Sequence, residues 1–375
     1  MKASYLDDLA KVTAEAVQPA AVQVDRQGQF PRAAIQALAD AGLLGLVSAA
    51  EVGGRGQGLR AAAEVVDRLA RDCASTAMVV CMHYAATAVL EANGPREVRE
   101  AVAAGRHLTT LAFSEAGSRS HFWAPVSSAV GNGGDQVRLN AVKSWITSAG
   151  EADSYVWSSR PLAADGLSTL WLVPADAPGL KVAGAFDGLG LRGNASSPVT
   201  ATDVGVSRGA MLGEDGRGDQ LMFGIVLPWF ACMSAAMSVG LMEAAIQAAV
   251  GHVTRVRLEH QGSSLAELAT IRAYLARMRV RADQARALLG DTLAAIEAKR
   301  EDALLGVLEV KASAGEAATE VTELAMRVCG GAAFRREVGV ERAFRDARAA
   351  TVMAPTTDML YDFIGRVLCG MDLFA

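Results

Sequence analysis

Apolar residues recur at three- and four-residue spacing from the N-terminus to about residue 105, and again from about residue 222 to the end of the chain. This spacing matches the 3.6-residue period of an α-helix and predicts two helical regions. Between about residues 108 and 215 the pattern changes to short Val- and Thr-rich runs separated by Gly, Asp and Asn, which is typical of strands and turns. We therefore expect a mainly α protein with a central β domain, divided into a helical domain (1–108), a β domain (109–218) and a helical bundle (219–375).

Turn residues indicate how the β domain is subdivided. Gly131-Asn-Gly-Gly-Asp135 lies between two strand-like runs and predicts a hairpin, because these residues tolerate the positive φ of a tight turn. Further strands are expected at residues 170–173 and 199–204, where Trp, Leu, Val and Thr predominate.

Capping residues indicate where the later helices begin and end. Ser264 and Glu267 form a capping-box pattern at the start of a long helix that continues to about residue 297. The next helix is expected over residues 302–328, with a left-handed C-terminal cap at Gly330-Gly331. A last helix follows Pro355.

One segment has the length of a membrane span. No charged residue occurs from Leu221 to Met242. Gly224 and Pro228 interrupt this segment, however, and it continues directly into a helix with polar residues that starts at Glu243. We therefore expect a helix buried in a helical core or at a subunit interface, and no membrane span.

Composition narrows the class of protein. A chain of 375 residues that is 51% hydrophobic, with a net charge of −5, is typical of a soluble protein with two or three lobes. It has no basic stripe for nucleic acid. Its five cysteines show no CxxC spacing, so we expect neither disulfides nor a metal site, and the acidic start does not resemble an export signal. A cytoplasmic location is expected.

The strongest candidate chemistry lies in Lys143-Ser-Trp-Ile-Thr147. In a regular strand Trp145 and Thr147 would share one side of the sheet, because side chains alternate between its faces. An aromatic face beside a hydroxyl suits a flat redox ring such as a flavin. The alternative is a half-buried strand in which Trp145 only fills the core.

The order of several motifs resembles the acyl-CoA dehydrogenase family over nearly the whole chain. These are Ser114-Glu115 with Ala116-Gly-Ser118, Lys143-Ser-Trp-Ile-Thr147, Gly188-Leu-Gly-Leu-Arg-Gly193, Val328-Cys-Gly-Gly-Ala332 and Glu341-Arg-Ala-Phe-Arg-Asp-Ala-Arg348. The resemblance implies an N-terminal helical domain, a middle β-barrel-like domain and a C-terminal four-helix bundle. It also implies FAD as cofactor, a homodimer or homotetramer, an acyl thioester substrate on coenzyme A or an acyl carrier protein, and a flavoprotein or oxygen as electron acceptor.

The same resemblance assigns site residues. At the flavin it places Phe113 and Ser114 beside the ring, Trp145 stacked on it and Thr147 donating to its reactive nitrogen. Other expected FAD contacts are Arg257, Arg327, Gly331, Thr356 and Asp358. The substrate's pantetheine arm would pass Ser118, with Arg119, His121 and Trp123 at the pocket entrance.

The chain departs from the family where a catalytic base is expected. The family's glutamate position falls on Ala354, and an alternative position falls on Phe230, so neither supplies a base. A displaced base could be Asp358, His121 or His83, although a histidine on an apolar helix, such as His83, is more often a core residue. The family's Arg-x-x-Phe-Gly element is also altered here, to Arg257-Leu-Glu-His-Gln-Gly262.

Three functions are consistent with these observations. The first is α,β-dehydrogenation of an acyl thioester with a non-standard or missing base. The second is a flavin-dependent monooxygenase of the same fold, whose oxygen insertion does not use that base. The third is a catalytically silent subunit of a mixed oligomer.

Overall fold

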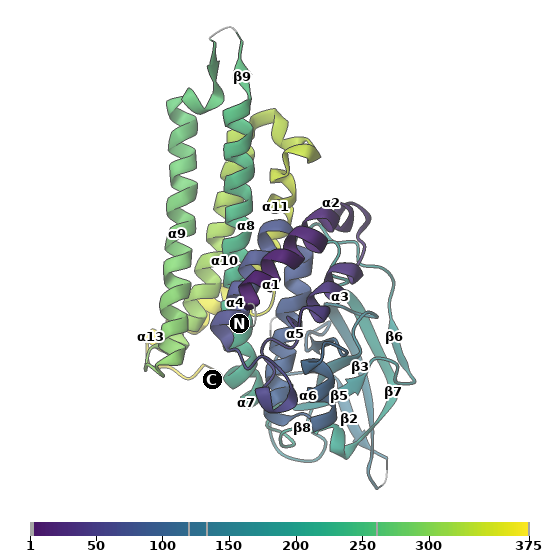
Figure 1. The fold of residues 1–375 in the computed structure, drawn as a ribbon. Coiled ribbons are helices and arrows are strands. Elements are labelled where there is room, and N and C mark those ends of the chain that lie inside the picture. Colours follow the sequence, from purple (N-terminus) through teal and green to yellow (C-terminus); the bar gives the residue numbers. More distant parts are fainter. Residues whose placement is uncertain (1–3, 119–120, 133, 260–261, 374–375) are drawn as a thin grey trace. The chain divides into compact units, whose positions relative to one another are not determined.

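The computed structural model describes residues 4–118, 121–132, 134–259 and 262–373 (Figure 1). The chain forms two compact units. We call the first, which comprises Met1–Val65, Ser75–Gly188 and Arg192–Phe230, the sheet unit. The second, the bundle unit, comprises Val66–Ala74, Leu189–Leu191 and Ala231–Ala375.

The N-terminal region is helical, as predicted. Helix α5 (Ala74–Asn93) is apolar on almost all sides and correspondingly buried, whereas α4 (Leu59–Asp72) is strongly amphipathic. The other helices of this region are α1 (Tyr5–Val12), α2 (Gln18–Gln27), α3 (Arg32–Asp40) and α6 (Arg96–Ala103).

The predicted β domain consists of two four-stranded sheets, with strand orders β1-β4-β5-β8 and β2-β3-β7-β6. They share a core in which Tyr155, Trp157 and Trp171 of one sheet pack with Val137 and Leu139 of the other. The strands are β1 (Thr109–Ala112), β2 (Ser128–Gly131), β3 (Gln136–Ile146), β4 (Ser154–Ser159), β5 (Thr169–Pro174), β6 (Leu180–Val182), β7 (Ser197–Ser207) and β8 (Met211–Leu212).

The strand predictions are confirmed. Strands β5 and β7 contain the two expected runs, and β2 pairs with β3 in the antiparallel hairpin expected around residues 131–135. The buried positions Val137, Leu139 and Ala141 alternate along β3, as expected for a strand with one face on the core.

The bundle unit contains the long helices α8 (Leu227–Arg255), α9 (Ala269–Glu297) and α10 (Ala303–Cys329), followed by α11 (Val340–Ala347), α12 (Ala349–Val352) and α13 (Thr357–Leu368). A short helix α7 (Gly218–Leu221) and a π-helical turn (Met222–Val226) lead into α8. The continuous helix Gly218–Arg255 is long and apolar enough to span a membrane, but 83% of its most apolar window is buried inside the protein. That burial agrees with the predicted core helix.

Two helix boundaries differ from the predictions. The Ser264–Glu267 capping box is present, but it caps a 3₁₀ turn (Leu265–Glu267), and α9 begins only at Ala269. Gly330 ends α10 with φ 57° and ψ −142°, which only glycine tolerates but which is not the left-handed helical conformation that we expected.

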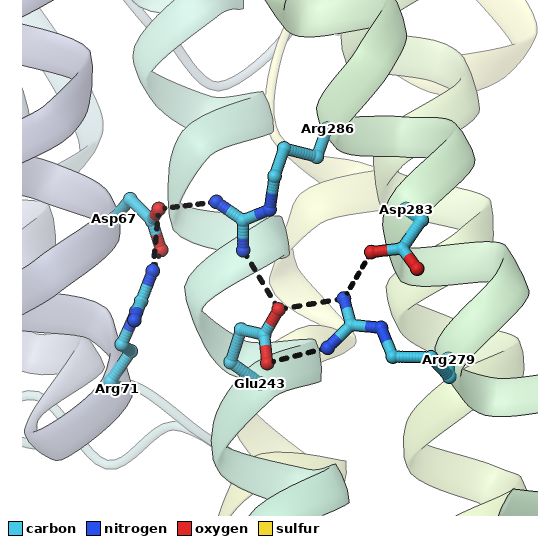
Figure 2. A network of polar contacts seen from close by, with 6 residues as sticks. All are labelled: Asp67, Arg71, Glu243, Arg279, Asp283 and Arg286. Carbon is cyan, nitrogen blue, oxygen red and sulfur yellow. Dashed lines mark hydrogen bonds and ion pairs between the residues drawn. The ribbon is translucent and has the colours of Figure 1, made fainter.

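An ion-pair network joins α4, α8 and α9 within the bundle unit (Figure 2). Glu243 on α8 accepts hydrogen bonds from Arg279 (2.8 and 2.9 Å) and Arg286 (2.8 Å), both on α9. Arg286 also donates to Asp67 on α4 (2.9 Å), which pairs in turn with Arg71. Charge-assisted hydrogen bonds therefore join α4 to two helices that are distant from it in the sequence.

Candidate functional site

Trp145 lies at an irregularity in β3. The pairing register between β3 and β7 shifts between Lys143 and Ile146, and Trp145 has a φ of +58°. Its side chain is 69% exposed, with the ring of Phe186 edge-on at 6.4 Å between centroids. A large aromatic held exposed in an unfavourable backbone conformation is typical of a functional site.

Thr147 lies just beyond the end of β3 and is only 4% exposed. Its Oγ1 is 3.1 Å from the Oγ of Ser196, a partner that the sequence did not indicate. The prediction that Trp145 and Thr147 are alternate positions of one regular strand is wrong, because the register shift interrupts the alternation. Both residues nevertheless lie in one irregular segment, the end of β3 and the turn after it (residues 145–149), which we call the Trp145 loop.

Further unusual backbone conformations adjoin this loop. Ser148 and Ala195 have φ of +60° and +51°, although neither is glycine. Main-chain hydrogen bonds from Ser148 N to Asn194 O (2.9 Å) and from Ala149 N to Ala195 O (3.1 Å) join the two loops. The loop after β3 and the loop before β7 therefore form one locally strained structure.

The segment from Phe113 to Ser118 lies beside this strand, as the family resemblance implied. Phe113 is buried, and the carbonyl of Ser114 accepts a hydrogen bond from Ser144 N at 2.9 Å. Glu115 and Lys143 form an isolated antiparallel bridge. The two motifs expected at the flavin are thus in direct contact.

Glu115 and Lys143 also form a buried ion pair, to which the sequence analysis assigned no role. Lys143 Nζ lies 2.6 Å from Glu115 Oε1, and both side chains are almost completely buried. Burial lowers the pKa of Lys143 to about 8, against the opposing effect of Glu115. Burial would raise the pKa of Glu115, but the charge and hydrogen bond of Lys143 outweigh it and hold that pKa below its ordinary value.

Of the three predicted substrate residues, the structure describes Ser118 and His121. Ser118 is buried, and its main-chain carbonyl accepts a hydrogen bond from the main-chain N–H of His121 (3.0 Å). His121 is exposed and lies edge-on to Trp123, which also contacts Phe223 at 5.4 Å between centroids. Arg119 lies outside the described residues.

His83 has the surroundings of a structural histidine. Its Nε2 lies 3.1 Å from the carbonyl of Leu44, and its Nδ1 accepts from Thr109 N at 3.2 Å. Burial lowers its pKa to about 4. Because both ring nitrogens bind main-chain groups, the geometry does not favour His83 as a catalytic base.

The predicted FAD contacts of the bundle unit lie at several of its turns. Arg327, near the end of α10, is exposed and donates to the Tyr274 hydroxyl (3.0 Å). A Cβ added at Gly331 would have no atom within 4 Å, so the surface beside this glycine is open. Arg257 is exposed in the short strand β9 (Arg257–Leu258) and donates to the carbonyl of Gly262 (3.0 Å).

Residue 354, to which the family resemblance assigned the catalytic glutamate, lies in the turn before α13. Thr356 is the N-cap of that helix and accepts from Met359 N at 3.4 Å. Asp358 is exposed in its first turn. The buried ammonium of Lys311 donates to three carbonyls of this turn, those of Ala350 (3.3 Å), Met353 (3.0 Å) and Pro355 (2.8 Å).

These features fit a flavin cofactor. The exposed face of Trp145 offers a stacking surface, and the Thr147 hydroxyl lies in the same strained loop. Taken by itself, the bundle unit has exposed guanidinium groups and a helix N-terminus, which are groups suited to binding phosphate.

Comparisons with known proteins identify the same family that the sequence motifs resemble. Models of acyl-CoA dehydrogenase domains match residues 3–105 (N-terminal domain), 110–204 (middle domain) and 222–369 (C-terminal domain). The human mitochondrial short-chain specific acyl-CoA dehydrogenase is 29% identical over 349 residues, or 91% of this chain and 83% of that protein.

Two solved structures have the same fold. Butyryl-CoA dehydrogenase from Megasphaera elsdenii superposes with a TM-score of 0.90 at 22% identity over 97% of both chains. The prolyl acyl carrier protein oxidase AnaB superposes with a TM-score of 0.87 at 21% identity over 98% of this chain and 99% of that one. The chain belongs to the acyl-CoA dehydrogenase family of FAD-dependent oxidoreductases, which act on CH–CH bonds.

Proposed function

We propose that this protein catalyses α,β-dehydrogenation of an acyl thioester and works without the usual glutamate at residue 354. The observation that carries the proposal is the contact of the Phe113–Ser118 segment with Lys143 and Ser144 of β3, directly before the positive-φ residue Trp145. Together they offer an aromatic face, hydroxyl groups and main-chain donors in one place. The proposal includes a cytoplasmic homodimer or homotetramer.

Bound FAD would supply the acceptor for a hydride from the substrate's β-carbon. Trp145 would hold the ring by stacking, while Phe113 and Ser114 lie against it. Ser196 can donate to Thr147 Oγ1 across their 3.1 Å contact, which leaves the Thr147 hydroxyl proton free to point at the flavin. The further FAD contacts that the family resemblance assigns are Arg257, Arg327, Gly331 and Thr356 of the bundle unit.

Removal of the α-proton is the step that lacks its usual residue. The methyl group of Ala354 cannot accept a proton, and a positioned base contributes ~100- to 10,000-fold in rate. Asp358 and His121 are both exposed, so a ligand can approach the side chain of each. We favour Asp358, because it lies in the first turn of α13, only four residues after residue 354.

The test is an anaerobic titration of the FAD-loaded protein with saturated acyl thioesters on coenzyme A and on acyl carrier protein, followed by flavin absorbance. Both carriers belong in the panel, because the similar proteins reported above include an acyl-CoA dehydrogenase and a prolyl acyl carrier protein oxidase. Bleaching by one thioester supports the proposal. Loss of bleaching in Asp358→Asn but not in His121→Gln would then identify the base, and the reverse would identify His121.

The absence of a carboxylate at residue 354 also favours a second function, a flavin monooxygenase, because oxygen insertion does not use that base. If no thioester bleaches the bound flavin, dehydrogenation is refuted. Rapid reoxidation of chemically reduced flavin by oxygen, with hydroxylation of an added small molecule, would then support oxygen insertion. A protein without either reactivity would fit a silent subunit of a mixed oligomer.

A further inference from the structure

The proposed chemistry makes no use of the most deeply buried charges of the sheet unit. Lys143 and Glu115 are fully enclosed, with side-chain exposures of 0% and 1%. Removing two charges from water is costly, and a well-packed apolar pair of similar volume is often as stable. Such a pair therefore calls for an explanation other than stability.

The contacts of the pair satisfy its hydrogen-bonding groups almost completely. Lys143 Nζ donates to Glu115 Oε1 (2.6 Å), to the carbonyl of Ser158 (2.7 Å) and to its Oγ (2.9 Å), and lies 5.1 Å from the centroid of the Trp157 ring. Three donors of one ammonium group thus have three acceptors. Glu115 Oε2 accepts from the main-chain nitrogens of Val126 (2.6 Å) and Ser127 (3.0 Å).

These hydrogen bonds join four separate segments of the sheet unit. They connect the Phe113–Ser118 segment, the chain at residues 126–127, strand β3 and strand β4. Ser127 Oγ closes the arrangement by donating to the carbonyl of Ser158 at 3.1 Å. Apolar side chains could fill the same volume, but they would not accept the hydrogen bonds that the main-chain N–H groups of Val126 and Ser127 donate to Glu115.

The pair lies where the two flavin-facing segments meet. Glu115 directly follows Ser114, and Lys143 is the last paired residue of β3 before the register shift that exposes Trp145. Any displacement of Lys143 relative to Glu115 would therefore move Trp145 relative to Phe113 and Ser114. A site of this kind requires its supporting contacts to hold the ligand-binding groups within about 0.5 Å.

We propose that Lys143 and Glu115 are positioning residues that fix the Trp145 loop and the Phe113–Ser118 segment at the spacing the flavin ring requires. This inference rests on the proposed function only in assuming that FAD binds here. The pair does not touch the substrate in this proposal. It acts through the segments that it joins.

The experiment compares Lys143→Met and Glu115→Gln with Asp215→Asn as a matched control. Asp215 is another carboxylate of the sheet unit, which accepts main-chain hydrogen bonds from Leu162, Ala163 and Ala164 and one from the Thr169 hydroxyl. Each variant is purified, and three quantities are measured: the melting temperature without FAD, the Kd for FAD by quenching of protein fluorescence, and the visible absorption spectrum of the saturated protein.

All three variants should melt at a lower temperature than the wild type. Only Lys143→Met and Glu115→Gln should raise the Kd for FAD by about tenfold or more and alter the shape of the flavin bands. If either single variant fails to fold, the double variant Lys143→Met/Glu115→Gln replaces it, because it leaves no unpaired charge in the core. The double variant should regain stability without regaining the wild-type Kd and spectrum.

The proposal is overturned if the pair's variants lose stability as Asp215→Asn does but keep the wild-type Kd and flavin spectrum. Neither readout needs a substrate. If the wild type binds FAD but no thioester reduces it, the proposed function fails while the comparison of Kd values still decides the role of the pair. If the wild type binds no FAD, the positioning role fails as well.

Discussion

Replacing Glu243 by Gln should destabilise the bundle unit by removing the central charge of its ion-pair network (Figure 2). Glu243 is only 12% exposed and accepts two hydrogen bonds from Arg279 and one from Arg286. The Gln side chain has the same shape, but its amide N–H group would face a guanidinium N–H. At least one hydrogen bond is therefore lost together with the charge.

The magnitude follows from these contacts. A hydrogen bond to a charged group contributes ~1.5–3 kcal/mol, so three of them set an upper limit. The Arg279 and Arg286 side chains remain 38% and 39% exposed, and both keep a second acidic partner, so solvent and Asp283 or Asp67 compensate for part of the loss. We expect a loss of about 2 kcal/mol in the free energy of unfolding and about 4–8 °C in Tm.

The assay is thermal unfolding monitored by circular dichroism, with Glu323→Gln as control. Glu323 is an exposed carboxylate on α10, so its variant should stay within about 0.5 kcal/mol of the wild type. Equal Tm values for Glu243→Gln and Glu323→Gln at pH 7 would refute the reasoning.

The same network predicts that the contribution of Glu243 to stability depends on pH. Hydrogen bonds from Arg279, followed by those from Arg286, lower the pKa of Glu243 below its ordinary value of 4.5. A carboxylate whose pKa is lowered on folding stabilises the folded state above its unfolded pKa, and this stabilisation is lost as the pH falls through the folded pKa. The Tm difference between wild type and Glu243→Gln should be constant above pH 4.5 and shrink below it. A difference that stays constant down to pH 3 would contradict this assignment.

Three further predictions concern packing, cofactor and base. Gly240→Ala would place a methyl group against a main-chain carbonyl of α4 and should lower the free energy of unfolding by about 1–3 kcal/mol. Gly290→Ala, on α9 with no atom within 4 Å of the added methyl group, should raise it by about 0.5–1 kcal/mol. Urea unfolding measures both, and equal effects would contradict the packing argument. Trp145→Ala should raise the Kd for FAD roughly 10- to 100-fold, because stacking on the ring is lost. Val142→Ala, at another exposed position of β3, should leave that Kd unchanged. Similar Kd values for the two variants would contradict stacking on Trp145. If dehydrogenation is confirmed, Ala354→Glu should speed single-turnover flavin bleaching by about 100-fold, while Ala354→Gln should leave it unchanged.

The secondary structure could be predicted because it follows from local patterns. Helices and strands differ in the period of their apolar residues, and the segments at 170–173 and 199–204 have the composition of strands. The start of α9 was placed too early because Ser264 caps a 3₁₀ turn, and a capping box indicates only that some helical turn begins.

The candidate site was only partly predictable, since it depends on contacts between distant segments. The register shift at Trp145 arises from the pairing of β3 with β7, which no local pattern of β3 records. The Lys143–Glu115 ion pair joins residues 28 positions apart. One signal was present: Lys143 is in phase with Val137, Leu139 and Ala141, the inward-facing positions of β3, so the alternation already placed a lysine on the core side.

The turn around residue 354, the position that we propose for the family's glutamate, is ordered by a buried lysine. Lys311 Nζ donates hydrogen bonds to carbonyls on both sides of Ala354: those of Ala350 and Met353 before it and that of Pro355 after it. The turn is therefore held in place independently of the side chain at 354, so the alanine removes a functional group without removing the local structure. A glutamate introduced there would be carried by an ordered backbone. For this reason, failure of Ala354→Glu to speed flavin reduction, in a protein that binds FAD normally, would indicate that proton abstraction occurs elsewhere or does not limit the reaction.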